Sequence, residues 1–270
     1  MNRIFTLLPF LHFILIPLSI ECWLQPDKFI YKWNEDINIR LFTGENFEGS
    51  DSEDGHSGLA TLSVYFDGMK DDLPGDYSDE NFDSIQLKIL DEGTAMVVYN
   101  SFDTLSGMEP EEFNVRLEKR GLSKVLDYRK QSNEMNNAGY LNHQQSVKTI
   151  FQVGKKYNNT FKIETSLPVD FIPQQNPYSL REGDSLEVLV LFQNEPISKQ
   201  PIRLWHKKEM RTIITELITN EKGLIKFPVT LEGIWMLSTE KSERQIVIKK
   251  TGPIINSWQS FTGSCTWGYE

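Results

Sequence analysis

The segments 37-INIRLFTG-44 and 59-LATLSVYF-66 decide the fold class. In the first, Ile37, Ile39 and Leu41 alternate with polar residues, and the second repeats this period of two. Such alternation is typical of β-strands that bury one face, whereas an amphipathic helix has a period near 3.6. We therefore expect a mainly β protein.

The pattern continues through the N-terminal part of the chain. Further strands are expected at 84–90, 94–100 and 146–154, with Gly- and Asp-rich loops between the early strands. Between them, Pro110 and the acids after it have the chemistry of a helix start, and Gly121 that of a helix end. A second short helix is expected at 123–131. The sequence predicts an N-terminal β-sandwich over 22–166 with a helical insertion near 109–145.

The C-terminal part, residues 167–270, has the pattern of a second sandwich. Short apolar runs follow one another at steady spacing, joined by turns such as 220-NEKG-223. This spacing is typical of a small Ig-like or transthyretin-like β-sandwich. The polar segment 155–166 is the expected linker, and we expect the aromatic tail 258–269 to dock onto the body. The expected strands are 169–173, 185–192, 202–207, 212–219, 224–229, 233–239 and 245–250.

Residues 1–21 have the pattern of a secretory signal peptide. Arg3 precedes an apolar run from Ile4 to Ile20, in the order of charge and apolar core that such signals have. Two prolines break a run that is shorter than the roughly 20 apolar residues needed to span a bilayer, so an uncleaved anchor is the less favoured alternative. We expect an exported protein, in the periplasm or associated with the outer membrane.

Cys22 is a candidate site for a lipid anchor. A cysteine directly after an export signal is a lipidation site, but the residue before it here is Glu21, where such signals have a small side chain. Lipidation at Cys22 is therefore the lesser alternative. Apart from the signal and this anchor, we expect no contact with a membrane.

Net charge and cysteine content give expectations about nucleic acid binding and about a disulfide. The net charge of −10 disfavours nucleic acid, whose phosphates would be repelled. The two cysteines, Cys22 and Cys265, lie at opposite ends of the exported chain, and an oxidising compartment permits one disulfide between them. The alternative is two small buried side chains that never meet, because spacing in sequence does not fix the separation of the Cα atoms.

An acidic, glycine-rich loop is the candidate metal site. Carboxylates suit Ca²⁺ or Mg²⁺, and an added imidazole suits Ni²⁺ or Zn²⁺. The alternative is a solvated acidic loop that binds nothing. No cofactor is established by these residues, and a divalent metal ion is the candidate. The residues concerned are Glu45, Glu48, Asp51, Glu53, Asp54 and His56.

Aromatic residues near both ends of the chain are the candidate ligand-binding set. Flat aromatic faces bury a large area at low entropic cost, so they could line a groove for a sugar or a peptide. The alternative is that they seal the junction between the two domains. The tryptophans of this set are Trp23, Trp33, Trp258 and Trp267.

The strong catalytic signatures are missing from the sequence. It has no G-x-S-x-G elbow, no H-E-x-x-H, no P-loop and no dinucleotide fingerprint. A single S-x-x-K, Ser238 to Lys241, lacks its companion motifs. We therefore expect a protein that is not an enzyme.

The chain resembles bacterial domain-of-unknown-function family 4198 over nearly all of its exported part. The resemblance lies in segments such as 22-CWLQPDKFIYKW-33, SVKTIFQVGKKYNNTF and the terminal WQSFTGSCTWGYE. It implies an exported protein of Gram-negative envelopes, and some members are associated with nickel or cobalt uptake. Members often have a histidine ahead of the W-x-x-P motif, where this chain has Ile20. Cys22 and Cys265 also depart from the family pattern, and together they favour the disulfide.

The leading hypothesis is a non-enzymatic envelope accessory or binding protein linked to transition-metal (nickel or cobalt) uptake. Its expected partner is an envelope transport or surface complex. The alternative is a structural or glycan-binding cell-surface module. An unrecognised hydrolase is a third hypothesis, because the sequence does not show which acids, bases and nucleophiles lie together.

Overall fold

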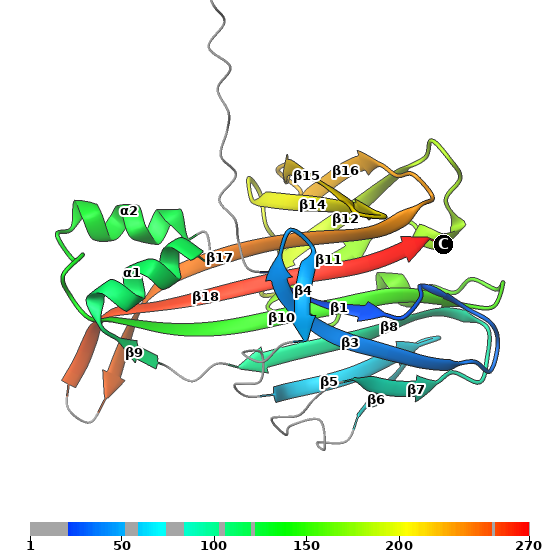
Figure 1. Cartoon of the computed structure of the whole chain (residues 1–270), viewed down its shortest axis with the longest axis horizontal. Helices are drawn as coiled ribbons and strands as arrows, with labels where there is room; N and C mark the ends of the chain where they lie inside the picture. Colours follow the sequence, from blue (N-terminus) through cyan, green and yellow to red (C-terminus); the bar gives the residue numbers. More distant parts are fainter. Residues whose placement is uncertain are drawn as a thin grey trace, which may run out of the picture.

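The computed structural model describes residues 21–51, 59–73, 84–102, 106–119, 122–249 and 252–269. It confirms a mainly β protein with several antiparallel strand pairs and two short α-helices (Figure 1). The strand pattern at 37–44 and 59–66 is matched by β3 (Asp36–Glu45) and β5 (Leu59–Phe66). The predicted signal peptide precedes the described residues, apart from Glu21, which begins β1.

A ten-stranded sheet, here called sheet B, runs through the middle of the molecule. Its centre is formed by three long strands, and β18 pairs in parallel with β10 and antiparallel with β17. Short strands β2 (Ile30–Tyr31) and β9 (Ser106–Met108) also pair with β10. The main order is β15 (Arg211–Ile218), β14 (Pro201–Lys208), β17 (Gly233–Lys249), β18 (Gly252–Tyr269), β10 (Gly139–Val153), β8 (Gly93–Phe102), β5 and β6 (Met69–Asp72).

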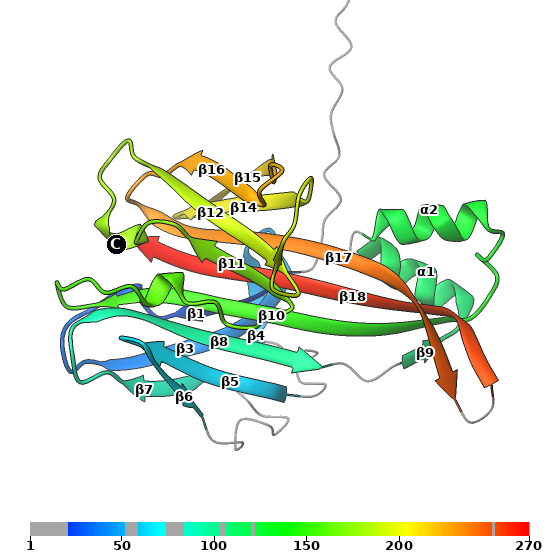
Figure 2. The same ribbon diagram turned by 180° about the vertical axis from the view of Figure 1, so that it is seen from behind.

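Two smaller sheets cover opposite faces of sheet B (Figures 1 and 2). Sheet A holds β1 (Glu21–Pro26), β3, β4 (Glu48–Asp51) and β7 (Ile85–Lys88), and sheet C holds β11 (Val169–Pro173), β12 (Ser185–Phe192), β13 (Glu195–Pro196) and β16 (Leu224–Pro228). Successive side chains of a strand point to opposite faces, so alternate residues of β18 contact sheet A and sheet C. Ser264 bonds the backbone of β1 in sheet A, whereas the ring of Phe261 lies 5.1 Å from that of Phe192 in sheet C.

Gly263 explains how closely sheet C approaches the long strands. A Cβ atom at this position would lie 2.3 Å from Cγ1 of Val169 in β11, well inside van der Waals contact. The absence of a side chain therefore lets β11 pack directly on β18. The main hydrophobic core contains Val169 and Phe171 of β11 together with side chains from both smaller sheets.

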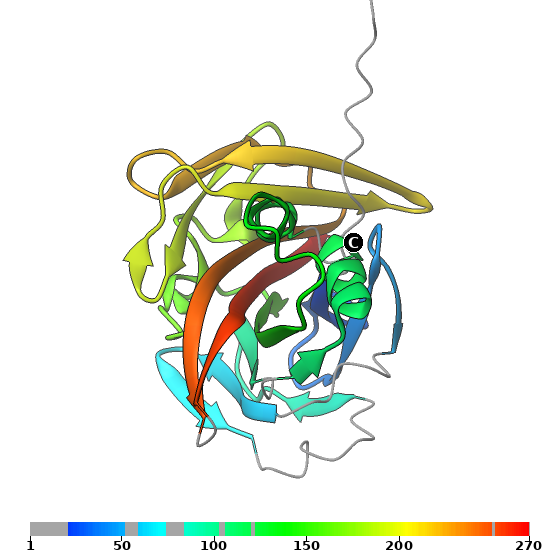
Figure 3. The same cartoon turned by 90° about the vertical axis from the view of Figure 1, so that its left-hand side faces the viewer.

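The long strands β10, β17 and β18 extend beyond the two smaller sheets as an arm (Figures 1 and 2). Both α-helices lie against this arm, which Figure 3 shows from its end. The helices are α1 (Pro110–Lys119) and α2 (Ser123–Gln131), at the expected positions. Their apolar faces form a second hydrophobic cluster with Leu141 of β10 and Trp258 of β18. Short 3₁₀ turns, η2 (Thr160–Lys162) and η3 (Pro177–Ser179), lie in the connection between β10 and β12.

Two expectations about elements need correction. The helical insertion was expected to extend to near residue 145, but β10 already begins at Gly139. The aromatic tail is the 18-residue strand β18 in the middle of sheet B. Because β10 and β18 are neighbours, sheet B also crosses the predicted boundary near residue 167, which itself stays a prediction. In the described part of the chain, no helix is long and apolar enough to cross a membrane.

Candidate functional site

The three long strands bring a histidine, a glutamate and two hydroxyl groups together on the face of sheet B that sheet A also covers. We call His143, Glu240, Ser260 and Thr262 the polar cluster. Strand register places His143 of β10 opposite Ser260 of β18, and Glu240 of β17 opposite Thr262. Directly opposed residues point to the same face, so the four side chains converge.

Hydrogen bonds connect the cluster through Ser260. Its hydroxyl donates to Oε1 of Glu240 at 2.5 Å, and Nδ1 of His143 lies 3.3 Å from the same oxygen. On the other side of the ring, Nε2 of His143 is 3.5 Å from Oγ1 of Thr262. His143 and Ser260 are buried, with 4% and 0% of their surface exposed, while Glu240 and Thr262 are half-buried. Solvent therefore reaches the cluster from the glutamate side.

The cluster lies between the helices and the start of β1. On one side is Trp258, two residues before Ser260, which packs against the helices. On the other side, Ser264 donates to the carbonyl of Cys22 at 2.6 Å, so β1 begins beside the part of β18 that precedes Ser264. At this start the carboxylate of Glu21 accepts a hydrogen bond from Nη1 of Arg203 at 2.8 Å.

The order of the groups decides what chemistry they suit. In a serine-hydrolase triad the histidine lies between the acid and the serine. Here Ser260 lies between Glu240 and His143, and its hydroxyl donates a hydrogen bond to the carboxylate. The arrangement instead offers an imidazole nitrogen and a carboxylate oxygen on either side of one hydroxyl, which are ligand types for first-row transition metals.

Sequence reasoning missed this cluster because it placed His143 in the helical insertion expected near 109–145. The signal was the alternation Leu141, His143, Gln145, Val147, which continues the period of two of the strand that follows. Leu141 packs with the helices and Val147 lies in the main core, and they mark the face on which His143 also lies.

The predicted metal loop is described only at its start. Glu45 and Glu48 are exposed and lie opposite each other where β3 and β4 meet, and Asp51 pairs with Phe42. Glu53, Asp54 and His56 lie outside the described residues. Among the residues that are described, no three His, Cys, Asp or Glu side chains group closely enough to hold a metal ion.

The four predicted tryptophans lie in separate places. Trp23 stacks on Phe42 and Phe47, Trp258 packs against the helices, and Trp267 stacks on Trp235. These three are buried, whereas Trp33 is 59% exposed and its indole N–H donates to the carbonyl of Leu90. They do not line one groove, because the strands that carry them bury three of the rings in different clusters.

The structure has Cys22 and Cys265 as two buried thiols, with no disulfide between them. Ser264 and Thr266, the neighbours of Cys265, both bond backbone carbonyls of β1. Cys265 therefore points to the opposite face of sheet B, away from β1 and Cys22. There, burial raises the pKa of the Cys265 thiol from 9.0 to about 12.

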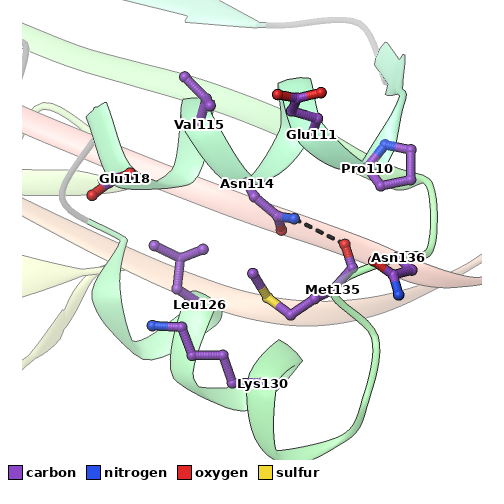
Figure 4. Close-up of a pocket in the computed structure, with 9 residues that line it drawn as sticks. All are labelled: Pro110, Glu111, Asn114, Val115, Glu118, Leu126, Lys130, Met135 and Asn136. Carbon is purple, nitrogen blue, oxygen red and sulfur yellow. Dashed lines mark hydrogen bonds between the residues drawn. The ribbon is translucent and has the colours of Figure 1, made fainter.

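A groove of about 420 Å³ runs between the two helices (Figure 4). Glu111, Val115 and Glu118 line the α1 side, and Leu126 and Lys130 line the α2 side. At one end, the Asn114 amide donates to the carbonyl of Met135 at 2.9 Å. This bond ties the segment after α2 to α1 and closes the groove on that side.

Buried Arg129 holds the helix pair together from beneath. Its Nε donates to Oδ1 of Asn114 at 2.9 Å, its Nη2 donates to the carbonyl of Asn137 at 2.8 Å, and its guanidinium lies 4.8 Å from the ring of Phe113. Burial lowers the pKa of Arg129. These contacts fix α2 against α1 and the arm.

The fold therefore defines a mainly β protein in which one long-stranded sheet carries two smaller sheets and a helix pair. The chain belongs to the family described as "Domain of unknown function (DUF4198)", whose model matches residues 21–243. A comparison with curated proteins gave no match.

Comparison with solved structures gave distant similarities. The FN1–FN3 domains of chicken CNTN1 are 8% identical with a TM-score of 0.21, and the alignment covers 88% of this chain and 60% of that one. Three N-terminal domains of the Highly Immunogenic Outer Capsid protein of bacteriophage RB49 are 7% identical with a TM-score of 0.20, covering 94% and 71%. Activated alpha-2-macroglobulin of Escherichia coli is 13% identical with a TM-score of 0.20, covering 94% and 22%.

Proposed function

We propose that this protein is a non-enzymatic accessory binding protein of the cell envelope, which binds a divalent transition-metal ion at the polar cluster. The observation that carries the proposal is the placement of the His143 imidazole and the Glu240 carboxylate on either side of the Ser260 hydroxyl. Imidazole and carboxylate together suit Ni²⁺, Co²⁺ and Zn²⁺ better than Ca²⁺ or Mg²⁺. The nickel and cobalt association implied by the family resemblance points the same way.

The described residues supply two ligands of this kind, so the proposed site is open. Water completes the coordination, and we expect the affinity to be modest compared with that of closed structural metal sites. The ligands must be deprotonated to bind, so metal binding is expected to release protons and to weaken in acid. Export to the envelope, expected from residues 1–21, would bring such a site to the compartment where uptake begins.

Calorimetric titration of the purified protein with Ni²⁺, Co²⁺, Zn²⁺ and Ca²⁺ tests the proposal. We expect heat with the transition metals, its loss in His143→Gln and in Glu240→Gln, and no change in His206→Gln. His206 is a matched control because it is a second histidine of sheet B, stacked on Trp235 at 4.0 Å and away from the cluster. The absence of heat at millimolar metal, or equal heat in His143→Gln, contradicts the proposal.

A glycan-binding surface module is the second candidate, and Trp33 is the observation that favours it. Its ring is 59% exposed and its orientation is fixed by the hydrogen bond to Leu90. Exposed, rigid aromatic faces suit contact with sugars. A glycan array probed with the wild type and Trp33→Ala tests this candidate, and binding that survives the substitution counts against it.

A further inference from the structure

The two outer edges of sheet B differ in how they are protected. At one edge, β6 is four residues long, has the sequence MKDD, and is exposed throughout. At the other edge, β15 has eight residues, RTIITELI, with no proline and only two charges. Natural sheets guard their edges with short strands and charges, because unpaired backbone groups invite another strand. The edge at β6 is guarded in this way, and the edge at β15 is not.

Strand geometry shows which groups β15 presents outward. A two-residue turn, Glu209 and Met210, joins β14 to β15, and Lys208 pairs with Arg211 across it. The pair that closes such a turn exchanges both backbone hydrogen bonds, and bonded pairs alternate from there. Odd-numbered residues of β15 therefore bond β14, while the N–H and C=O groups of Thr212, Ile214, Glu216 and Ile218 point away from it. In the described parts of the chain, no backbone group pairs with this outer side.

Large apolar side chains gather at the same edge. Met210 is 97% exposed, Ile213 46% and Ile218 66%, and all three belong to β15 or to the turn before it. Residues 201–218 also carry four basic and two acidic side chains, in a chain whose net charge is −10. This edge therefore has the composition of a pairing strand, without the excess negative charge that repels a second molecule.

We propose that two copies of this protein pair through β15, antiparallel and about a two-fold axis at Ile214, to form one continuous sheet. In this register the outward backbone groups of Ile214 bond those of its copy, and Thr212 lies opposite Glu216 of the other copy. The hydroxyl of Thr212 then donates to that carboxylate. Met210 lies opposite Ile218 of the other copy, so the two most exposed apolar side chains of the edge cover each other. The occupant of the edge is therefore a second copy of the same strand.

Sedimentation of the purified full chain from micromolar to millimolar concentration tests the proposal. We expect a monomer–dimer equilibrium in the wild type. Ile214→Lys and Ile214→Glu each bring like charges together at the axis, so each is expected to sediment as a monomer. An equimolar mixture of the two variants places opposite charges there and is expected to restore the dimer.

Met69→Lys at the guarded edge is the matched control, because Met69 is 68% exposed in β6 and is expected to leave the dimer intact. Circular dichroism of each variant shows whether the fold is retained, and the mixture experiment reads out pairing from variants that are folded. A monomeric wild type at millimolar concentration overturns the proposal. So does a dimer that persists in Ile214→Lys, or a mixture of the Lys and Glu variants that stays monomeric.

Discussion

Lys148 and Asp170 form an ion pair that is buried between sheet B and sheet C, with 0% and 2% of their side chains exposed. Lys148 lies on β10 of sheet B, and Asp170 lies on β11 of sheet C. The carboxylate also accepts hydrogen bonds from the backbone and hydroxyl of Thr165, at 2.9 and 3.0 Å. Burying two charges is costly, and the cation together with the two hydrogen bonds from Thr165 offsets that cost for the Asp170 carboxylate.

Removing one member of this pair is expected to destabilise the protein severely. Lys148→Met leaves the Asp170 carboxylate buried without its cation, and we expect a loss of about 3–5 kcal/mol in the free energy of unfolding. Lys148→Met combined with Asp170→Leu removes both charges, and we expect most of that loss to be recovered. Urea denaturation followed by tryptophan fluorescence measures both. A double variant no more stable than the single one contradicts this reading of the pair.

The close contact at Gly263 gives a second prediction. Gly263→Ala places a Cβ atom 2.3 Å from Cγ1 of Val169, so sheet C must move away from β18. Overpacking of this kind costs about 1–3 kcal/mol. Val169→Ala removes Cγ1 but keeps Cβ, which would lie 2.7 Å from the new Cβ atom, so it relieves the clash only in part. We therefore expect the double variant Gly263→Ala/Val169→Ala to lose less stability than the sum of the losses of the two single variants. Thermal melts of all four proteins provide the cycle, and strict additivity would show that the contact does not matter.

Trp258 is expected to hold the helix pair on the arm. Its ring lies 5.5 Å from that of Tyr128 and packs in the cluster of Leu141 and Phe113. Trp258→Ala leaves a large cavity there, for which we expect a loss of about 3–5 kcal/mol. Limited proteolysis should then cut first within 110–131. Trp33→Ala, at an exposed tryptophan, serves as the control and should leave the cleavage pattern unchanged.

The cysteines provide a prediction that also depends on pH. Both thiols are buried, so intact mass should be the same before and after reduction, and alkylation should require unfolding. In the folded protein burial raises the pKa of Cys265 from 9.0 to about 12, so the unfolded thiol loses its proton first as pH rises. The contribution of Cys265 to stability is therefore present below pH 9 and lost between 9 and 12. Cys265→Ala should remove this part of the alkaline loss, and a mass gain of two hydrogens on reduction would instead reveal a disulfide.

The strands that the sequence pattern predicted and those that it missed differ in how many of their faces are buried. The alternation of Ile37, Ile39 and Leu41 predicted β3, because one face of that strand is core and the other is polar. β18 was mistaken for a tail because both of its faces are covered. Its hydroxyl residues Ser264 and Thr266 bond carbonyls of β1, so polar side chains occupy buried positions. A pattern of apolar residues does not reveal polar side chains that are buried because they are hydrogen-bonded.

The candidate site was harder to predict than the fold, because its residues meet only through the pairing of long strands. Glu240 and Ser260 lie on the consecutive strands β17 and β18, but His143 on β10 is 117 residues before Ser260, and only the register of the three strands brings it beside them. Local spacing instead drew attention to the acidic loop after Glu45. Local motifs reveal sites built within one segment, whereas this cluster depends on long-range pairing.

Cobalt absorption spectroscopy tests the central claim most directly, because ligand-field bands of Co²⁺ report the coordinating atoms themselves. We predict that Co²⁺ added to the wild type develops bands that differ from those of the aqueous ion, that His143→Gln abolishes them, and that His206→Gln leaves them unchanged. Bands of the same position and intensity in His143→Gln, or no bands in the wild type at millimolar Co²⁺, would contradict metal binding at the polar cluster.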